Sequence, residues 1–292
     1  MNSHERQIGL WYESLTSKHM ARSRQEKHTT VVREIVDATV ARNVTPRDLL
    51  VKCCIRLPLI AWAHAGDALT KTVDKKPLPW VQISRHLLYV YWAERIERVP
   101  LVPADDGPTT RSRRGLYLLD ALAVGQDELA RWFGQNLRRW RRELGRAWEP
   151  DRVENFALWL FTRWSGDSPP PEEQPLALGA YEALATAWES GGEPLRAAIS
   201  DACDWRMEHT LADDPEDETF EWGFDEPPYI LYPAEILALE RVRRSQGLDT
   251  PRPDHALLRT PAAHLPQFPL PLPDDSLIDR VVAAVRKVYP GL

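Results

Sequence analysis

The sequence DELARWFGQNLRRWRREL, residues 127–144, has the periodicity of an amphipathic helix. Its large apolar residues recur at steps of three or four, which places them on one face of a helix. Most of its arginines point to other sides. We therefore expect a helix with one buried face, formed by Leu129, Trp132, Phe133, Leu137, Trp140 and Leu144.

The same spacing recurs along most of the chain, and no strand-like alternation of useful length interrupts it. Thr45-Pro46-Arg47-Asp48, for example, supplies a capping residue, a proline at the first helical position and an acid in the first turn. The sequence predicts an all-α bundle of about ten helices. The other helices are expected at 31–43, 45–62, 80–99, 115–124, 151–164, 178–188, 193–211, 233–244 and 278–288.

A proline-rich linker divides the predicted helices into two groups. Residues 166–175 read GDSPPPEEQP, a composition typical of linkers. We expect an N-terminal helical region over 1–165 and a smaller C-terminal helical lobe over 176–292. Within this lobe the proline-rich tail, 250–275, is expected to run irregularly over the surface.

Composition favours a globular protein of the cytoplasm. The chain has 292 residues, 43% of them hydrophobic, with 12 Trp, enough to bury a core. Its charged start has no apolar stretch of signal-peptide length, and no apolar run predicts a membrane span. The three cysteines form no CxxC pattern, which fits a disulfide-free fold in a reducing compartment.

Charge is unevenly distributed along the chain. Residues 1–150 hold 25 Lys+Arg and 17 Asp+Glu, a balance of +8, whereas residues 151–292 hold 12 and 26, a balance of −14. No Lys or Arg occurs between Arg206 and Arg241. The acidic half can attract the basic half within the fold, or it can present a field to a basic partner.

The motifs that signal catalysis are missing from the sequence. GxGxxG, GxxxxGK[ST], GxSxG and HExxH do not occur, and the 14 glycines are scattered. We therefore expect no enzymatic activity, no catalytic residues, no cofactor and no bound metal. The nearest approach to a metal site is Asp201, Asp204, Glu208 and His209 on one predicted helix, because carboxylates with a histidine bind hard metals. A solvated acidic face explains them more simply.

Two other groups of reactive side chains have structural explanations. The neighbours Asp254 and His255 resemble half of a nucleophile-activating unit, but no serine or cysteine lies nearby in the sequence. A hydrogen-bonded loop histidine is expected instead. Cys53 and Cys54 lie in an apolar helical context, which is typical of buried, inert thiols.

The arginines of 127–144 do not predict nucleic-acid binding. They are interleaved with Trp132 and Trp140, but the tryptophans belong to the apolar face. The pI of about 5.8 also opposes attraction to a phosphate backbone. We interpret the arginines as the solvated side of a structural helix.

The segment ADDPEDETFEWGFDEPPY, residues 212–229, is the strongest local signal of function. Acids steer a basic partner toward a surface, and large rings supply buried contact area. The alternative is an acidic loop whose rings pack into this protein's own core. As a binding surface it would consist of Asp213, Asp214, Glu216, Asp217, Glu218, Phe220, Glu221, Trp222, Phe224, Asp225 and Glu226.

Several stretches taken together resemble a known family. They are LYLLDALAVGQDELARWF from Leu116, YEALATAW from Tyr181, ACDWRMEHT from Ala202, PPYILYPAEILALERVRRSQGL from Pro227 and PRPDHALLRTP from Pro251. Their order over about 116–265 is similar to that in bacterial immunity proteins of the PoNe-immunity type, which protect against polymorphic-toxin nucleases and are associated with type VI secretion. The chain departs from that pattern in its proline-rich tail and in lacking a Gly-Tyr-Trp motif.

The resemblance implies a cytosolic, helical, non-enzymatic protein that acts in bacterial competition. It would bind a cognate toxin domain and occlude the toxin's active site, with no nucleic acid or membrane as partner. Two alternatives remain from the residues themselves. One is a helical scaffold or adaptor, and the other is a metal-dependent all-α hydrolase that uses Asp201, Asp204, Glu208 and His209.

Overall fold

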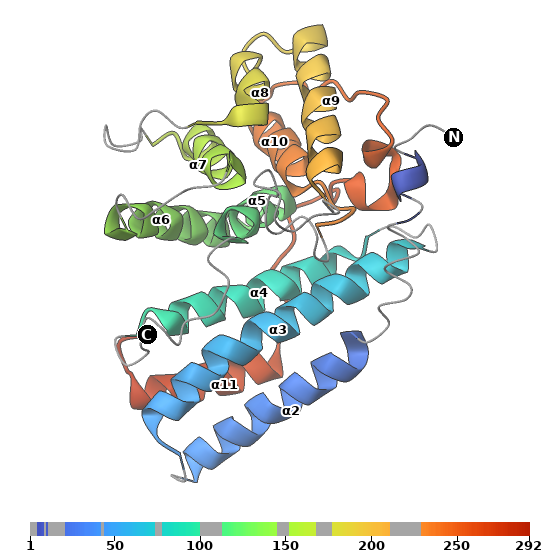
Figure 1. The fold of residues 1–292 in the computed structure, drawn as a ribbon. Helices are drawn as coiled ribbons and strands as arrows, with labels where there is room; N and C mark the ends of the chain where they lie inside the picture. The colour runs from blue at the N-terminus through green and yellow to red at the C-terminus, as the bar shows by residue number, and fades with distance from the viewer. Residues whose placement is uncertain are drawn as a thin grey trace.

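The regular structure of the chain is helical, as the sequence predicts (Figure 1). The described residues include ten α-helices with defined bounds, α2 to α11, and three short 3-10 helices, and residues 5–8 are helical as well. The all-α fold is thereby confirmed. The computed structural model describes residues 5–8, 10, 21–41, 44–73, 78–99, 113–144, 152–167, 177–210 and 229–292.

Four helices form the first of two layers. Helix α3 packs along both α2 and α4, and α11 contacts all three of them. In Figure 1 these helices form the lower half of the molecule, with α11 beside α2 and α3. The bounds are α2 Ala21–Val40, α3 Pro46–Val73, α4 Trp80–Glu97 and α11 Ser276–Val288.

The second layer is organised around α5, every residue of which is buried. Helix α5 contacts α6, α7 and α10, and it also touches α4, which joins the two layers. The short η5 helix (Gly179–Tyr181) with α8 and α9 completes this layer. The bounds are α5 Arg114–Val124, α6 Asp127–Leu144, α7 Arg152–Ser165, α8 Glu182–Thr186, α9 Gly192–His209 and α10 Ala234–Ser245.

The two layers do not follow the order of the chain. The first layer takes α11 from the end of the sequence, and the second takes α5 to α7 from before the predicted linker. Helices from both predicted ranges, 1–165 and 176–292, therefore contribute to both layers. The division into those ranges stays a prediction about how the chain is organised.

Local sequence signals explain where the helices begin and how closely they approach. The hydroxyl of Thr45 accepts a hydrogen bond from the amide of Asp48 at 3.1 Å and donates one to its carboxylate at 2.7 Å, which caps α3 as expected. Gly134 allows α6 to lie against α7, because a Cβ at this position would be 2.5 Å from the ring of Phe161. A close crossing of this kind requires glycine.

Helix α3 is apolar because it lies inside the protein. It is the one helix of the described residues that is long and apolar enough to cross a membrane by length and composition. In the structure 67% of its most apolar window is buried, and α2 and α4 pack along it. A helix buried in a protein core can be as long and as apolar as a membrane span, so the packing of α3 accounts for its composition.

The proline-rich tail is partly buried rather than wholly on the surface. Two 3-10 helices, η6 Leu257–Arg259 and η7 Pro261–Ala263, interrupt its irregular course. Leu257, Ala262 and Ala263 are fully buried there. Apolar residues between the prolines thus anchor the tail to the core.

Candidate functional site

The eleven residues expected to bind a partner lie in the stretch 211–228, outside the described residues. Both ends of this stretch are described, however. Thr210 follows the end of α9, and Tyr229 opens the turn that leads into α10. The site is therefore defined structurally by what holds these two ends.

Arg206 of α9 contacts both ends, the first through its backbone and the second through its side chain. The hydroxyl of Thr210 donates to the carbonyl oxygen of Arg206 at 2.7 Å. The Arg206 guanidinium donates through Nη2 to the carbonyl oxygens of Tyr229 and of Tyr232, the latter at 2.9 Å. The Thr210 bond belongs to the last turn of α9, whereas the Arg206 side chain holds the turn at which the chain re-enters the helical body.

A buried ion pair holds Arg206 in place. Its Nη1 lies 2.6 Å from each carboxylate oxygen of Glu235 in α10, and neither side chain is exposed to solvent. Burying two charges costs several kcal/mol each unless they are paired and hydrogen-bonded. Here the carboxylate accepts from Nη1 and the two carbonyl oxygens accept from Nη2, so the pair joins α9, α10 and the turn between them.

A second buried contact fixes Tyr229. Its hydroxyl donates to Oδ2 of Asp120 in α5 at 2.6 Å, and Nε2 of His86 in α4 lies 3.9 Å from the same oxygen. Burial raises the pKa of Asp120 to about 8, while the hydrogen bond from Tyr229 acts in the opposite direction. Burial lowers the pKa of His86 to about 4. Both shifts favour the neutral forms at neutral pH, so the hydrogen bond from Tyr229, and not an ion pair with His86, holds this contact.

We refer to Arg206, Glu235, Asp120 and Tyr229 as the anchor cluster. It was not anticipated from the sequence, although a signal for it exists. Arg206 occupies the apolar stripe of α9 that runs through Leu195, Ile199 and Ala202, and all of these residues are buried. A single charge in an apolar helical stripe indicates a buried partner elsewhere in the chain.

The four residues considered for a metal site do not form one. In the described part of the chain no group of three or more His, Cys, Asp or Glu side chains is placed to hold a metal ion. Asp201 and Glu208 are exposed on α9. His209 stacks on Trp205, with ring centroids 4.6 Å apart, and its Nδ1 lies 2.7 Å from the Trp205 carbonyl oxygen. The metal-dependent hydrolase therefore receives no support from these residues.

His255 is a hydrogen-bonded loop histidine, but its partner is not its neighbour in sequence. Its Nε2 lies 3.1 Å from a carboxylate oxygen of Asp204, and its Nδ1 accepts from the amide of Leu257 at 3.2 Å. Asp254 instead pairs with Arg259 at 2.6 Å. The Asp204–His255 contact fastens the proline-rich tail to α9.

The cysteines are buried and free, as expected. Burial raises the pKa of Cys53 to about 12 and holds the pKa values of Cys54 and Cys203 well above the ordinary range. Thiols in this state are poor nucleophiles because the reactive form is the thiolate. These cysteines serve as core residues.

Two arginines of α6 make contacts within the fold, whereas Arg139 and Arg142 are exposed, as expected for a solvated side. Arg138 donates to the Thr162 hydroxyl at 2.9 Å, and Arg131 lies over the ring of Trp164 at 5.4 Å. Arg114 lies over Trp140 at 4.1 Å. These contacts tie α6 to α7 and α5, which gives the basic stretch a structural role.

Comparison of the chain with protein-family models, with curated proteins and with solved structures gives no match in any of the three. The anchor cluster and the acidic segment therefore have to be interpreted from their own chemistry.

Proposed function

We propose that this chain is a cytoplasmic immunity protein that binds and neutralises a cognate bacterial toxin. The toxin would be a nuclease-type secreted effector, of the kind associated with type VI secretion, and the chain would occlude its active site without enzymatic activity. One observation carries the proposal: the acidic and aromatic segment 213–226 lies between the last turn of α9 and a turn that the buried Arg206 side chain holds.

Anchoring both ends favours binding by the segment. A binding loop loses conformational entropy when it becomes ordered on a partner, and that loss weakens the complex. Ends that are fixed on a helical body reduce the freedom available to the loop before binding. The ion pair between Arg206 and Glu235 provides this body, because it joins the helices on both sides of the segment.

The charge of the segment matches the chemistry of a nuclease. A site that binds phosphates is lined with positive charge. The acids between Asp213 and Glu226, with no Lys or Arg among them, attract such a surface over a distance and accelerate association. Trp222, with Phe220 or Phe224, supplies the large buried rings that dominate many interfaces.

The described side chains support binding rather than catalysis. The thiols are protonated by burial, and Asp204 and His255 hold each other. The ionisable groups of the anchor cluster are fully buried and contact one another. Their arrangement fits a cluster that stabilises the platform of the segment.

The test uses the product of the gene next to this one as the candidate toxin. Asp213, Asp214, Asp217 and Glu218 are replaced together by Asn or Gln, and affinity for the toxin and protection of cells are measured. We expect a large loss of affinity and of protection, with the thermal unfolding temperature unchanged.

A matched control removes the same charge elsewhere. Four exposed acids on other elements, Glu26, Glu34, Asp167 and Glu182, are replaced in the same way. This variant should bind and protect like the unmodified chain. Equal affinity for the unmodified chain and the segment variant would refute the proposed interface, and absence of any complex would refute the immunity function with this toxin.

A further inference from the structure

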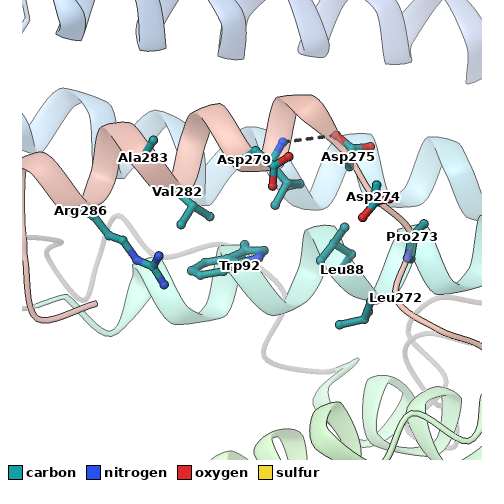
Figure 2. A pocket seen from close by; sticks show the side chains of 11 residues that line it. Leu88, Trp92, Leu272, Pro273, Asp274, Asp275, Asp279, Val282, Ala283 and Arg286 are labelled. Carbon is teal, nitrogen blue, oxygen red and sulfur yellow. Dashed lines mark hydrogen bonds between the residues drawn. The ribbon is translucent and has the colours of Figure 1, made fainter.

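A groove of about 410 Å³ lies between α4 and α11, on the side of the first layer (Figure 2). Its apolar part is formed by Leu88 and Trp92 of α4 and Val282 of α11. Leu272, at the end of the proline-rich tail, lines the groove and remains 38% exposed. The groove thus combines an apolar floor with an apolar side chain exposed at its edge.

The two ends of the groove carry opposite charge. Asp274 and Asp279 line one end and Arg286 lines the other, with Trp92 and Val282 between them, as Figure 2 shows. Within the described residues neither aspartate makes an ion pair. Among the described residues, Arg286 donates from Nε to an oxygen of Leu292 at 3.4 Å and lies over the ring of Trp92 at 5.9 Å.

The spacing of these charges on α11 makes the surface complementary to itself. Asp279 and Arg286 are seven residues apart, two helical turns or about 10.5 Å along one face. A two-fold axis that crosses α11 between Val282 and Ala283 places Asp279 of one copy opposite Arg286 of the other, twice. Ala283 is exposed at the centre of this face, and its small side chain allows two helices to approach closely.

We propose that this groove is the interface of a symmetric dimer, in which α11 of one copy packs antiparallel to α11 of a second copy. The same rotation brings Leu272 of each copy to the Trp92 end of the other groove. Such an interface is isologous, the commonest kind in homodimers. It uses no residue of the segment 213–226, so it can be tested without the toxin.

The test measures the mass of the protein alone by sedimentation equilibrium at concentrations from micromolar to submillimolar. We expect the mass to rise from that of the 33.5 kDa monomer toward twice this value. Asp279→Arg and Arg286→Glu should each weaken the dimer about ten-fold or more, because each removes two ion pairs and creates like-charge contacts. The double variant, with the charges exchanged, should regain most of the affinity.

Leu272→Ser should also weaken the dimer about ten-fold, because it removes the apolar side chain offered to the partner groove. Val40→Ser serves as its control, since Val40 is 60% exposed at the end of α2 and does not line the groove. A monomer at every concentration would overturn the proposal. So would a dimer that both single charge reversals leave unchanged, or a double variant that is no stronger than either single one.

Discussion

The guanidinium of Arg206 and the carboxylate of Glu235 face each other inside the protein, with Nη1 2.6 Å from both oxygens and no exposure of either side chain. We expect Arg206→Met to lower the free energy of unfolding by about 3–5 kcal/mol, because it strands a buried carboxylate. Urea denaturation measures this loss. Arg244→Met, at an exposed position of α10, the helix that carries Glu235, should change stability by less than about 0.5 kcal/mol. Equal effects of the two changes would show that the buried pair contributes little.

Asp120 should make stability fall as pH rises. Its folded pKa is about 8, whereas an unfolded aspartate titrates near 3.9. Between these values the folded state holds a proton that the unfolded state has released. The stabilisation is therefore complete below about pH 4 and is lost as pH approaches 8, with a slope of up to about 1.4 kcal/mol per pH unit.

Asp120→Asn isolates this effect, because the amide cannot titrate and its oxygen can still accept from Tyr229. Unfolding in urea at pH 5, 6, 7 and 8 gives the difference in stability between the variant and the unmodified chain. That difference should increasingly favour the variant as pH rises. Contributions from Glu94, His64 and His86, whose pKa values are also shifted, largely cancel in the subtraction. Parallel pH profiles would contradict the assignment.

The three thiols should be unreactive in the folded protein. Cys53, Cys54 and Cys203 are buried with raised pKa values, so little thiolate is present at neutral pH. A colorimetric thiol reagent should label none of them in minutes under native conditions and all three in guanidinium chloride. Rapid labelling of one cysteine in the native protein would reveal an accessible thiolate.

Gly134→Ala should separate α6 from α7. The added Cβ would meet the ring of Phe161 at 2.5 Å, a distance that requires the helices to shift. Overpacking of this kind costs about 1–3 kcal/mol, which thermal or urea unfolding will show. Gly291→Ala is the matched control, because its Cβ would make only an ordinary contact, at 3.5 Å from Tyr289. A stability of the Gly134 variant equal to that of the control would mean that the crossing adjusts freely.

Salt should slow capture of the proposed toxin more than it speeds release. The acids of 213–226 act over a distance that ions screen, with a Debye length of about 8 Å at 0.15 M. Stopped-flow association at several salt concentrations should give a steep decrease in rate for the unmodified chain. The four-acid variant should show a much shallower decrease. The same slope for both would place the electrostatic attraction elsewhere on the surface.

Spacing along the sequence predicted the helices because helical periodicity is local. Residues 127–144 form α6 over the whole expected range, and Thr45 caps α3. The anchor cluster depends instead on partners far apart in sequence, such as Asp120 and Tyr229, which no local pattern identifies. The same is true of His255, since the carboxylate beside it in sequence is not the one that it contacts. The position of α11 in the first layer likewise follows from contacts between the two ends of the chain.

The packing of α11 against α2, α3 and α4 determines when the first layer can be completed during synthesis. Helices α2, α3 and α4 leave the ribosome before the second layer, but the surface that Ile278, Val281 and Val285 cover stays open until α5 to α10 have been made. All helices of the second layer are therefore translated before α11 completes the first layer. Apolar surface left open in this way favours aggregation. Layer-by-layer folding on the ribosome would leave the first layer unfinished, and the native state is reached only when α11 packs on α2, α3 and α4.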